Sequence, residues 1–186
     1  RGKAPMGGLK ETVMDMNFGM REENRALLQR VADMIRDVVM PLEEEYHGEI
    51  GQGDRWHYTD RQAEILEGLK AQAKAAGLWN FWLTDSEKGF GLSAVGNGYV
   101  AEEMGKAPRG AEGFNCSAPD TGNMEVFERY GTAAMKEQWL APLLEGEIRS
   151  AYLMTEPEVA SSDATNIAMS CVRHGDDYVL NGEKYW

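Results

Sequence analysis

The sequence predicts an α+β chain in which an all-α helical domain, residues 15–147, is followed by the beginning of an antiparallel β domain, residues 148–186. Two observations support this division. Up to Gly146 the apolar residues recur every three or four positions, as on one face of a helix. After Gly146 the pattern changes to short apolar runs with Gly-Asp and Asn-Gly pairs, which are typical of tight turns. A chain of 186 residues, 42% of them hydrophobic, is long enough to bury a core.

The clearest helix is predicted at residues 21–46. A wide apolar stripe marks one of its faces and consists of Leu27, Leu28, Val31, Met34, Ile35, Val38, Val39 and Leu42. Pro41 is expected to kink or interrupt this helix, because proline lacks the backbone N–H and clashes with the preceding turn. The acidic run at residues 43–45 is interpreted as a solvated face rather than as a metal site.

A second helix is predicted at residues 60–76, because its apolar residues again follow helical spacing. Gly77 comes directly after it, where a left-handed helix cap is expected. The aromatic segment 78–83 is expected to form a strand-like apolar anchor, which leads into a surface loop at residues 84–89.

A third helix is predicted to start after Ser93, whose hydroxyl can cap it, and to end at Met104 before Gly105. Gly89 and Gly91 precede this helix, and a glycine-rich loop before a helix can bind a dinucleotide. Their spacing is not that of a dinucleotide-binding motif and no βαβ unit surrounds them, so loop geometry explains these glycines better.

Two more helical stretches complete the predicted helical domain. The first covers residues 119–130 and ends at Gly131. Thr132 can then cap the next stretch, which is amphipathic and ends at Gly146. Pro142 lies inside that stretch, so a break or two short helices are expected there.

The remaining residues indicate strands. Residues 148–154 form a strand-like run, and residues 172–186 have the pattern of strands joined by tight turns at residues 175–176 and 181–182. Asn-Gly is among the strongest hairpin signals, because both residues tolerate a positive φ. The sequence stops at Trp186 within a predicted strand, so we expect it to be a piece of a longer protein.

Composition excludes several classes of function. The formal net charge of −12 argues against nucleic acid or an anionic membrane as a general partner, and no apolar run is long enough to span a membrane. Cys116 and Cys171 are isolated thiols that indicate a reduced compartment. The three histidines lack the spacing of a zinc site, so no metal is predicted. Residues 1–14 are expected to be a flexible leader. A cytoplasmic location is expected for a bacterial protein, and a mitochondrial or peroxisomal one for a eukaryotic protein.

The chemically most informative segment is YLMTEPEVASSD, residues 152–163. A strand exits into a turn set by Pro157, and a loop of small and hydroxyl-bearing residues follows. Thr155, Ser161 and Ser162 supply hydroxyl groups there, and free backbone amides can hold the edge of a polar heterocycle or a phosphate. Spacing alone favours the plainer interpretation, a strand followed by a turn rich in Ser and Asp.

This segment resembles the signature of the acyl-CoA dehydrogenase family, in which Thr-Glu-Pro is followed by a small-residue loop and Ser-Asp. Residues 178–186, YVLNGEKYW, are similar to the Asn-Gly-x-Lys-x-Trp hairpin of that family. Residues 130–146 fit its helical part. Residues 114–125 and 159–167 are similar to the branch that includes acyl-CoA dehydrogenase family member 11. The loop differs from the commonest family loop, TEPGAGSD, by one extra residue and by the absence of its glycines.

The resemblance implies the front portion of the acyl-CoA dehydrogenase fold, without its C-terminal helical domain, and FAD as the cofactor. The cofactor-binding residues that it implies are Tyr152, Met154, Thr155, Ser161, Ser162 and Trp186. Met154 and Thr155 would contact the pyrimidine end of the flavin through backbone amides and the Thr155 hydroxyl. Ser162 would also lie near the acyl-CoA thioester, and Trp186 would pack beside the ring.

The activity that the resemblance implies is removal of two hydrogens across the α and β carbons of a fatty acyl-CoA, with hydride transfer to FAD, as in β-oxidation. The family's glutamate base belongs to the C-terminal domain, so no catalytic residue is assigned here, and Glu156 in particular is not assigned that role. The implied partners are acyl-CoA, electron-transfer flavoprotein and further copies of the chain in a homodimer or homotetramer.

Two alternatives remain open from the sequence. One is an acyl-CoA oxidase or a nitroalkane oxidase-like flavoenzyme on the same fold. The other is a non-catalytic helical module that binds acyl-CoA or a protein partner. The coding sequence that follows Trp186 would distinguish the second from the first, because only an enzyme needs a carboxylate placed over the flavin.

Overall fold

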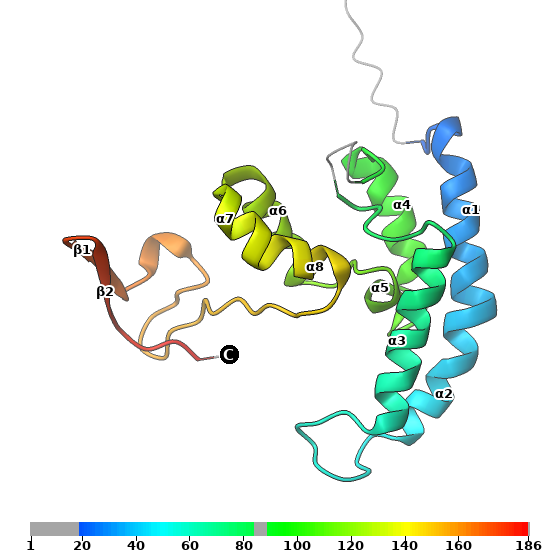
Figure 1. The fold of residues 1–186 in the computed structure, drawn as a ribbon, viewed down its shortest axis with the longest axis horizontal. Coiled ribbons are helices and arrows are strands. Elements are labelled where there is room, and N and C mark those ends of the chain that lie inside the picture. Colours follow the sequence, from blue (N-terminus) through cyan, green and yellow to red (C-terminus); the bar gives the residue numbers. More distant parts are fainter. Residues whose placement is uncertain (1–18, 84–88, 186) are drawn as a thin grey trace, which may run out of the picture.

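The structure is a computed structural model that describes residues 19–83 and 89–185. Two groups of helices lie side by side, and a two-stranded hairpin lies apart from them (Figure 1). The helices are α1 (Arg25–Met34), α2 (Met40–Gly48), α3 (Asp60–Ala75), α4 (Ala94–Met104), α5 (Gly110–Gly113), α6 (Asp120–Tyr130), α7 (Ala133–Met135) and α8 (Ala141–Glu145). The strands are β1 (Ser170–His174) and β2 (Asp177–Asn181), so the predicted α+β class is confirmed. The predicted leader, residues 1–14, lies outside the described residues, as does most of the predicted loop 84–89.

Two π-helical turns, Ile35–Val39 and Lys136–Leu140, join α1 to α2 and α7 to α8. A proline follows each turn within two residues, Pro41 in one case and Pro142 in the other. The amide just after each turn donates to the carbonyl five residues earlier, one residue further than in an α-helix. The wider turn accommodates the missing donor and the bulk of the ring. The disturbances expected at the two prolines are therefore π turns rather than breaks.

Side-chain caps begin three of the helices. At α4 the Ser93 hydroxyl accepts a hydrogen bond of 3.1 Å from the amide three residues on, and Thr132 does the same at α7 over 3.3 Å. Both caps were predicted. Thr59 and Gln62 form a reciprocal capping box at α3, with both bonds 3.1 Å long. Gly77 follows α3 with a φ of +61°, as expected for a left-handed cap.

The main core lies where α1, α2, α3 and α4 pack together. The predicted apolar stripe of residues 21–46 supplies one side of this core, and α3 supplies another. Its buried side chains include Leu27, Val31, Ile35, Val39, Tyr46, Ile65, Leu66, Leu69, Val100 and Phe114. Burial of this apolar surface is the main favourable term in the folding of the helical part.

Segment 78–83 is buried, as its composition predicts, but it is not a strand. Three of its apolar side chains are at most 2% exposed, namely Leu78, Phe81 and Leu83. The backbone turns at Asn80, where φ is +54°. Trp79 and Asn80 donate side-chain hydrogen bonds of 2.7 and 2.8 Å to the carbonyl of Leu144 and so satisfy the end of α8. The strand-like expectation was wrong because turns and side-chain bonds, rather than a ladder, satisfy this buried segment.

A smaller core joins α6 to α8 and is formed by Met124, Leu140 and Leu143. Trp82 packs against both cores and so links the two groups of helices. Asn115 strengthens the junction, because its Nδ2 donates to Asn80 Oδ1 over 2.7 Å and to the Leu143 carbonyl over 3.0 Å. The two groups of helices therefore form one packed unit, held by apolar contacts and by a partly buried pair of side-chain amides.

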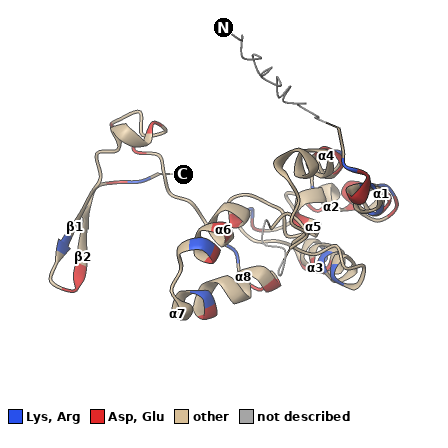
Figure 2. Cartoon of the chain, turned by 90° about the horizontal axis from the view of Figure 1, so that it is seen from above, with Lys and Arg blue, Asp and Glu red and all other residues tan. Residues whose placement is uncertain are grey.

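Charged residues of both signs are interspersed over the helices (Figure 2). The acidic run 43–45 is only partly the solvated face that the sequence predicts. Glu45 is exposed and pairs with Arg61 over 2.7 Å. Glu43 instead points inward, with 14% of its side chain exposed, and its Oε1 accepts a 2.6 Å bond from the backbone amide of Arg109. The prediction was wrong for Glu43 because the start of α5 needs an acceptor there.

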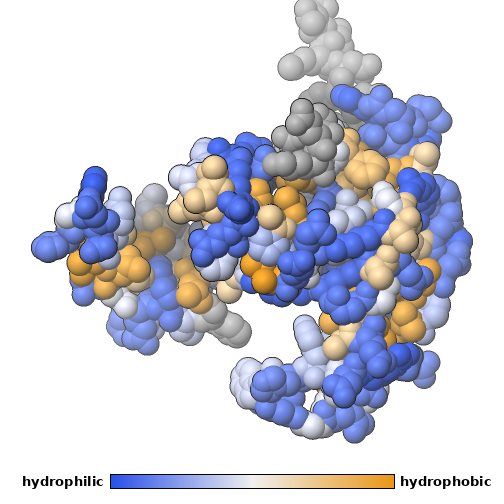
Figure 3. All heavy atoms as spheres, in the orientation of Figure 1, coloured by the Kyte–Doolittle hydropathy of each residue, from blue (hydrophilic) through white to orange (hydrophobic). Residues whose placement is uncertain are grey.

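β1 and β2 pair antiparallel from Ser170 opposite Asn181 to His174 opposite Asp177. The predicted turn at residues 175–176 joins them and is confirmed. No strand follows the second predicted turn, residues 181–182, within the described chain, and residues 148–154 are extended but unpaired, so the strand expected there was wrong. Every residue of both strands is exposed, and Figure 3 shows apolar atoms on the surface of the hairpin. A strand needs a paired neighbour and a covered face, and neither is available in the described chain to residues 148–154 or to the residues after the second turn.

Candidate functional site

Two segments that are far apart in the sequence meet at the Thr-Glu-Pro turn. The amide of Tyr185 donates to the carbonyl of Thr155 over 2.9 Å, as in a short piece of strand pairing. Next to it, Lys184 Nζ donates to the carbonyl of Met154 over 3.0 Å. These bonds hold the chain before Glu156 against the chain after the hairpin.

Glu156 is the centre of this arrangement, and 5% of it is exposed. Its Oε1 accepts from Lys184 Nζ over 2.8 Å and from the amide of Met169 over 3.0 Å, and its Oε2 accepts from the amide of Ala168 over 2.8 Å. The hydrogen bond from Lys184, with smaller help from these amides, lowers the pKa of Glu156 below its usual range. Its carboxylate is therefore a structural acceptor and a poor proton acceptor.

The loop after the turn is folded back on itself. Ser161 is 1% exposed, and its Oγ accepts a 2.6 Å bond from the amide of Glu156. Asp163 accepts from the amide and the hydroxyl of Thr165 over 3.0 and 2.6 Å, and these bonds lower the pKa of Asp163. Ser162 lies between these two fixed residues and is exposed. The small-residue loop is thus held rigidly on both sides of one accessible hydroxyl.

The six sequence-predicted cofactor residues are placed differently from one another. Tyr152 is 65% exposed, and Met154 and Thr155 are half-buried beside the Lys184 contact. Among the described residues, the amides of Met154 and Thr155 and the Thr155 hydroxyl have no hydrogen-bond partner, so these donors are available to a ligand. Ser161 uses its hydroxyl internally. The predicted site residue Trp186 lies outside the described residues.

Sequence reasoning did not anticipate the ion pair between Lys184 and the Glu156 carboxylate. Both belong to the two motifs that carry the family resemblance, and this co-occurrence was the available signal. Nothing in the spacing indicates that they are partners, because they lie 28 residues apart in the chain.

The linker from α8 to the loop is tied to the helical part through Asp120, which is 2% exposed. Its Oδ1 accepts from the amide and the hydroxyl of Ser150 over 2.7 and 2.5 Å, and its Oδ2 accepts from Arg149 Nε over 2.6 Å. Arg149 also contacts Glu112. This network fixes the direction in which the chain leaves the helices.

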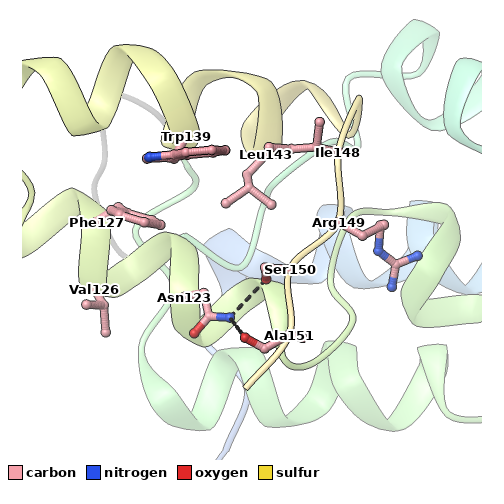
Figure 4. Close-up of a pocket in the computed structure, with 9 residues that line it drawn as sticks. All are labelled: Asn123, Val126, Phe127, Trp139, Leu143, Ile148, Arg149, Ser150 and Ala151. Atoms are coloured by element: carbon pink, nitrogen blue, oxygen red, sulfur yellow. Dashed lines mark hydrogen bonds between the residues drawn. The ribbon is translucent and has the colours of Figure 1, made fainter. Parts of the chain in front are cut away.

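A hollow of about 360 Å³ lies beside this linker. In Figure 4 the side chains of Phe127, Trp139 and Leu143 face it from the helices, and Asn123 points across it to the linker. Asn123 Nδ2 donates to Ser150 Oγ over 2.9 Å and, more weakly, to the Ala151 carbonyl over 3.4 Å. The hollow is mostly apolar, and its single amide serves the linker rather than a ligand.

A second hollow of about 420 Å³ lies between α4 and α6. Its walls include the apolar side chains of Leu92, Ala101 and Met104. Asn97 also lines it, and the Asn97 Oδ1 atom is buried without a hydrogen-bond partner among the described residues. Burial raises the pKa of the Cys116 thiol in the same wall well above its usual range, so this thiol is protonated and unreactive at neutral pH.

Two further observations concern the described residues alone. Three or more His, Cys, Asp or Glu side chains do not gather anywhere in residues 19–83 and 89–185 as a metal site would require. No helix in the same part of the chain is long and apolar enough to cross a membrane.

Comparison with known proteins identifies the helical part. Residues 21–147 match the family described as "Acyl-CoA dehydrogenase, N-terminal domain". The chain is 47% identical over 173 residues to acyl-CoA dehydrogenase family member 10 of Mus musculus, covering 90% of this chain and 16% of that protein. It is 41% identical over 175 residues to the probable acyl-CoA dehydrogenase FadE2 of Mycobacterium tuberculosis, covering 92% of this chain and 41% of that protein.

A solved structure from Mycobacterium abscessus, described as an acyl-CoA dehydrogenase, matches with a TM-score of 0.80 and 46% identity. The match covers 90% of this chain and 42% of that one, so the chain spans less than half the length of these relatives. Members 10 and 11 of the family both occur among the similar proteins, in agreement with the branch indicated by the motifs. The chain belongs to the acyl-CoA dehydrogenase family, and residues 21–147 correspond to the N-terminal domain of that family.

Proposed function

We propose that the protein containing this chain is an FAD-dependent acyl-CoA dehydrogenase, which removes two hydrogens across the α and β carbons of a fatty acyl-CoA thioester. The observation that carries the proposal is the Thr-Glu-Pro turn, in which internal bonds immobilise Glu156 and leave the donors of Met154 and Thr155 free. Membership of the family supports the same activity.

The free donors fit the cofactor. The pyrimidine edge of an isoalloxazine ring carries two carbonyl oxygens and one unprotonated ring nitrogen, N1, that accept hydrogen bonds. The amides of Met154 and Thr155 and the Thr155 hydroxyl supply three donors on consecutive residues, without competing partners in the described chain. Fixed donors of this kind orient a ring and cost little reorganisation. When bound, FAD would supply the hydride acceptor.

The remaining predicted residues have distinct proposed roles. Ser161 shapes the loop through its bond to the amide of Glu156. The exposed Ser162 hydroxyl is available to the flavin and to the thioester end of the substrate. Tyr152 and Trp186 are proposed as flanking contacts of the ring. None of these groups removes a proton, and Glu156, with its lowered pKa and its partner Lys184, is not the base. The base is proposed to lie in a part of the protein beyond this chain.

We propose the hollow between α4 and α6 for the acyl chain, because its apolar walls suit an alkyl group. Ala101→Phe would narrow it. Activity on long acyl-CoA substrates should then fall relative to short ones, measured as the ratio of kcat/KM values. An unchanged ratio would exclude this hollow as the chain site.

The test of the function uses the protein produced from its complete reading frame. Its absorbance spectrum is recorded with FAD, and then acyl-CoA and an artificial electron acceptor are added. We expect a yellow protein whose flavin is bleached by acyl-CoA. Electron-transfer flavoprotein should replace the artificial acceptor, whereas rapid reoxidation by oxygen alone would indicate an oxidase instead. A protein that takes up no FAD would contradict the proposal.

A matched pair of variants localises the site. Thr155→Val removes a free hydroxyl and should weaken FAD binding several-fold, by roughly the 1 kcal/mol of one hydrogen bond. Thr165→Val makes the same change ten residues further along the same loop, where Asp163 holds the hydroxyl internally. It should leave the affinity for FAD unchanged, and equal losses in the two variants would show a general loop effect rather than a contact.

A further inference from the structure

Lys184 occupies the point where the two family motifs touch. Its ammonium group bonds the Met154 carbonyl over 3.0 Å and Glu156 Oε1 over 2.8 Å. Only 16% of the Lys184 side chain and 5% of the Glu156 side chain are exposed. Lysine and glutamate are seldom buried to this degree unless they are paired. The Lys184–Glu156 pair is therefore far less exposed than surface pairs such as Arg25–Glu22 and Arg61–Glu45.

Both oxygens of the Glu156 carboxylate accept hydrogen bonds. The amides of Ala168 and Met169 reach it from the loop, and the ammonium group of Lys184 reaches it from the other motif. The backbone amide of Glu156 itself donates to Ser161. One side chain thus links the turn, the loop at residues 168–169 and Lys184, and removing either charge would leave the other buried without an opposite charge.

The same contacts decide which way the neighbouring backbone faces. The carbonyls of Met154 and Thr155 are held toward the second motif by Lys184 and by the amide of Tyr185. Their amides are left without partners in the described residues, so they remain available for a ligand. If the Lys184 contact were lost, the Met154 carbonyl would be free to turn, and the donors beside it would turn with it.

We propose that Lys184 and Glu156 are positioning residues of the flavin site: their buried ion pair locks the Thr-Glu-Pro turn to the second motif and so sets the donors that receive the ring. This inference rests on the proposed function and assigns to the two residues no contact with substrate. The pair acts through Met154 and Thr155. The lowered pKa of Glu156 agrees with a carboxylate that stays ionised in this role.

The test uses the complete protein and compares three variants, Lys184→Met, Glu156→Gln and the double variant that carries both changes. FAD affinity is measured by titration, and the visible absorbance and circular dichroism of the bound flavin report its surroundings. Each single variant should weaken FAD binding at least about tenfold and shift the flavin bands. Thermal unfolding of each variant is measured in parallel.

The double variant separates positioning from simple charge balance. It removes both charges, so stability should largely recover compared with the single variants. The flavin site should not recover, because the Met154 carbonyl still lacks its partner and the glutamine offers the two loop amides one acceptor oxygen in place of two. Recovery of both stability and FAD affinity in the double variant would overturn the positioning role, and so would a Lys184→Met protein with unchanged affinity and spectrum.

Two controls complete the experiment. Lys106→Met removes an exposed lysine that pairs with Glu103 over 2.7 Å, and it should change neither FAD affinity nor the spectrum. Lys184→Arg keeps a positive charge and should retain more FAD affinity than Lys184→Met. A wild-type protein that binds no flavin would refute the proposed function and this inference together. If the wild type binds flavin but the Lys184 and Glu156 variants keep its FAD affinity and spectrum, the inference alone is refuted.

Discussion

Asp120 anchors the linker after α8 to the helices through its bonds to Arg149 and Ser150. The contribution of this anchor to stability can be tested by removing the Asp120 carboxylate. Asp120→Ala abolishes three hydrogen bonds, two from Ser150 and one from Arg149. A bond to a charged acceptor contributes about 1.5 kcal/mol or more, so the two Ser150 bonds amount to roughly 3 kcal/mol. The Arg149 side chain is 46% exposed, and water can replace its partner, so this ion pair adds at most about 1 kcal/mol. We expect a loss of about 3 to 4 kcal/mol in unfolding free energy.

Urea denaturation followed by tryptophan fluorescence measures this loss, because Trp82 and Trp139 lie next to the cores that the anchor supports. Glu64→Ala is the matched control, since it removes a carboxylate whose side chain is 67% exposed and which pairs with Arg61 over 3.1 Å, so it should cost less than about 0.5 kcal/mol. Asp120→Asn keeps one acceptor oxygen, so its loss of unfolding free energy should lie between that of Asp120→Ala and that of the control. An Asp120→Ala protein as stable as the control would refute the assignment of Asp120 as the anchor.

Three further predictions concern stability. Asn97→Leu removes a buried oxygen, Oδ1, that has no hydrogen-bond partner in the described residues, so it should raise the unfolding free energy by about 1 kcal/mol in a denaturant titration. A clear loss of unfolding free energy would show that this oxygen accepts a hydrogen bond in the protein. Gly146→Ala should cost about 2 kcal/mol by the same assay, because φ is +70° there and a Cβ would lie 2.9 Å from Trp79, so a neutral result would contradict the close contact. The lowered pKa of Glu156 means that its contribution is present above the usual glutamate range and is lost as pH falls through its folded pKa. Below pH 4.5, the usual pKa of a glutamate, the wild type should therefore lose stability more steeply than Glu156→Gln, and parallel curves would contradict this linkage.

The helical part could be predicted in some detail from the sequence, because its signals are local. The apolar stripe of residues 21–46, the caps at Ser93 and Thr132 and the left-handed Gly77 all act within a few residues of themselves. Segment 78–83 was harder to predict. Its burial follows from its composition, but its turns depend on Leu144, which is more than sixty residues away.

The candidate site shows the same limit. The motif 152–163 and the hairpin motif could be recognised, and Ser161 and Thr155 were expected to contact a cofactor. The sequence did not indicate that the Ser161 hydroxyl would accept a hydrogen bond from the amide of Glu156. It also did not indicate that Lys184, 28 residues further along, would pair with the Glu156 carboxylate. Partners of this kind are chosen by how the chain folds back and not by spacing.

What the sequence determined by itself is the main helices, the caps at Ser93 and Thr132, the hairpin turn at residues 175–176 and the family to which the chain belongs, because helical periodicity, turn residues and motif letters are local properties. What only the tertiary structure decided is which polar groups are hydrogen-bonded within the described chain and which have no partner there. Glu156 became an acceptor enclosed by Lys184 and two amides, while the donors of Met154 and Thr155 remained available. The physical reason is that a buried charge must find its partners in three dimensions, and the groups left without partners are those that a ligand can bind.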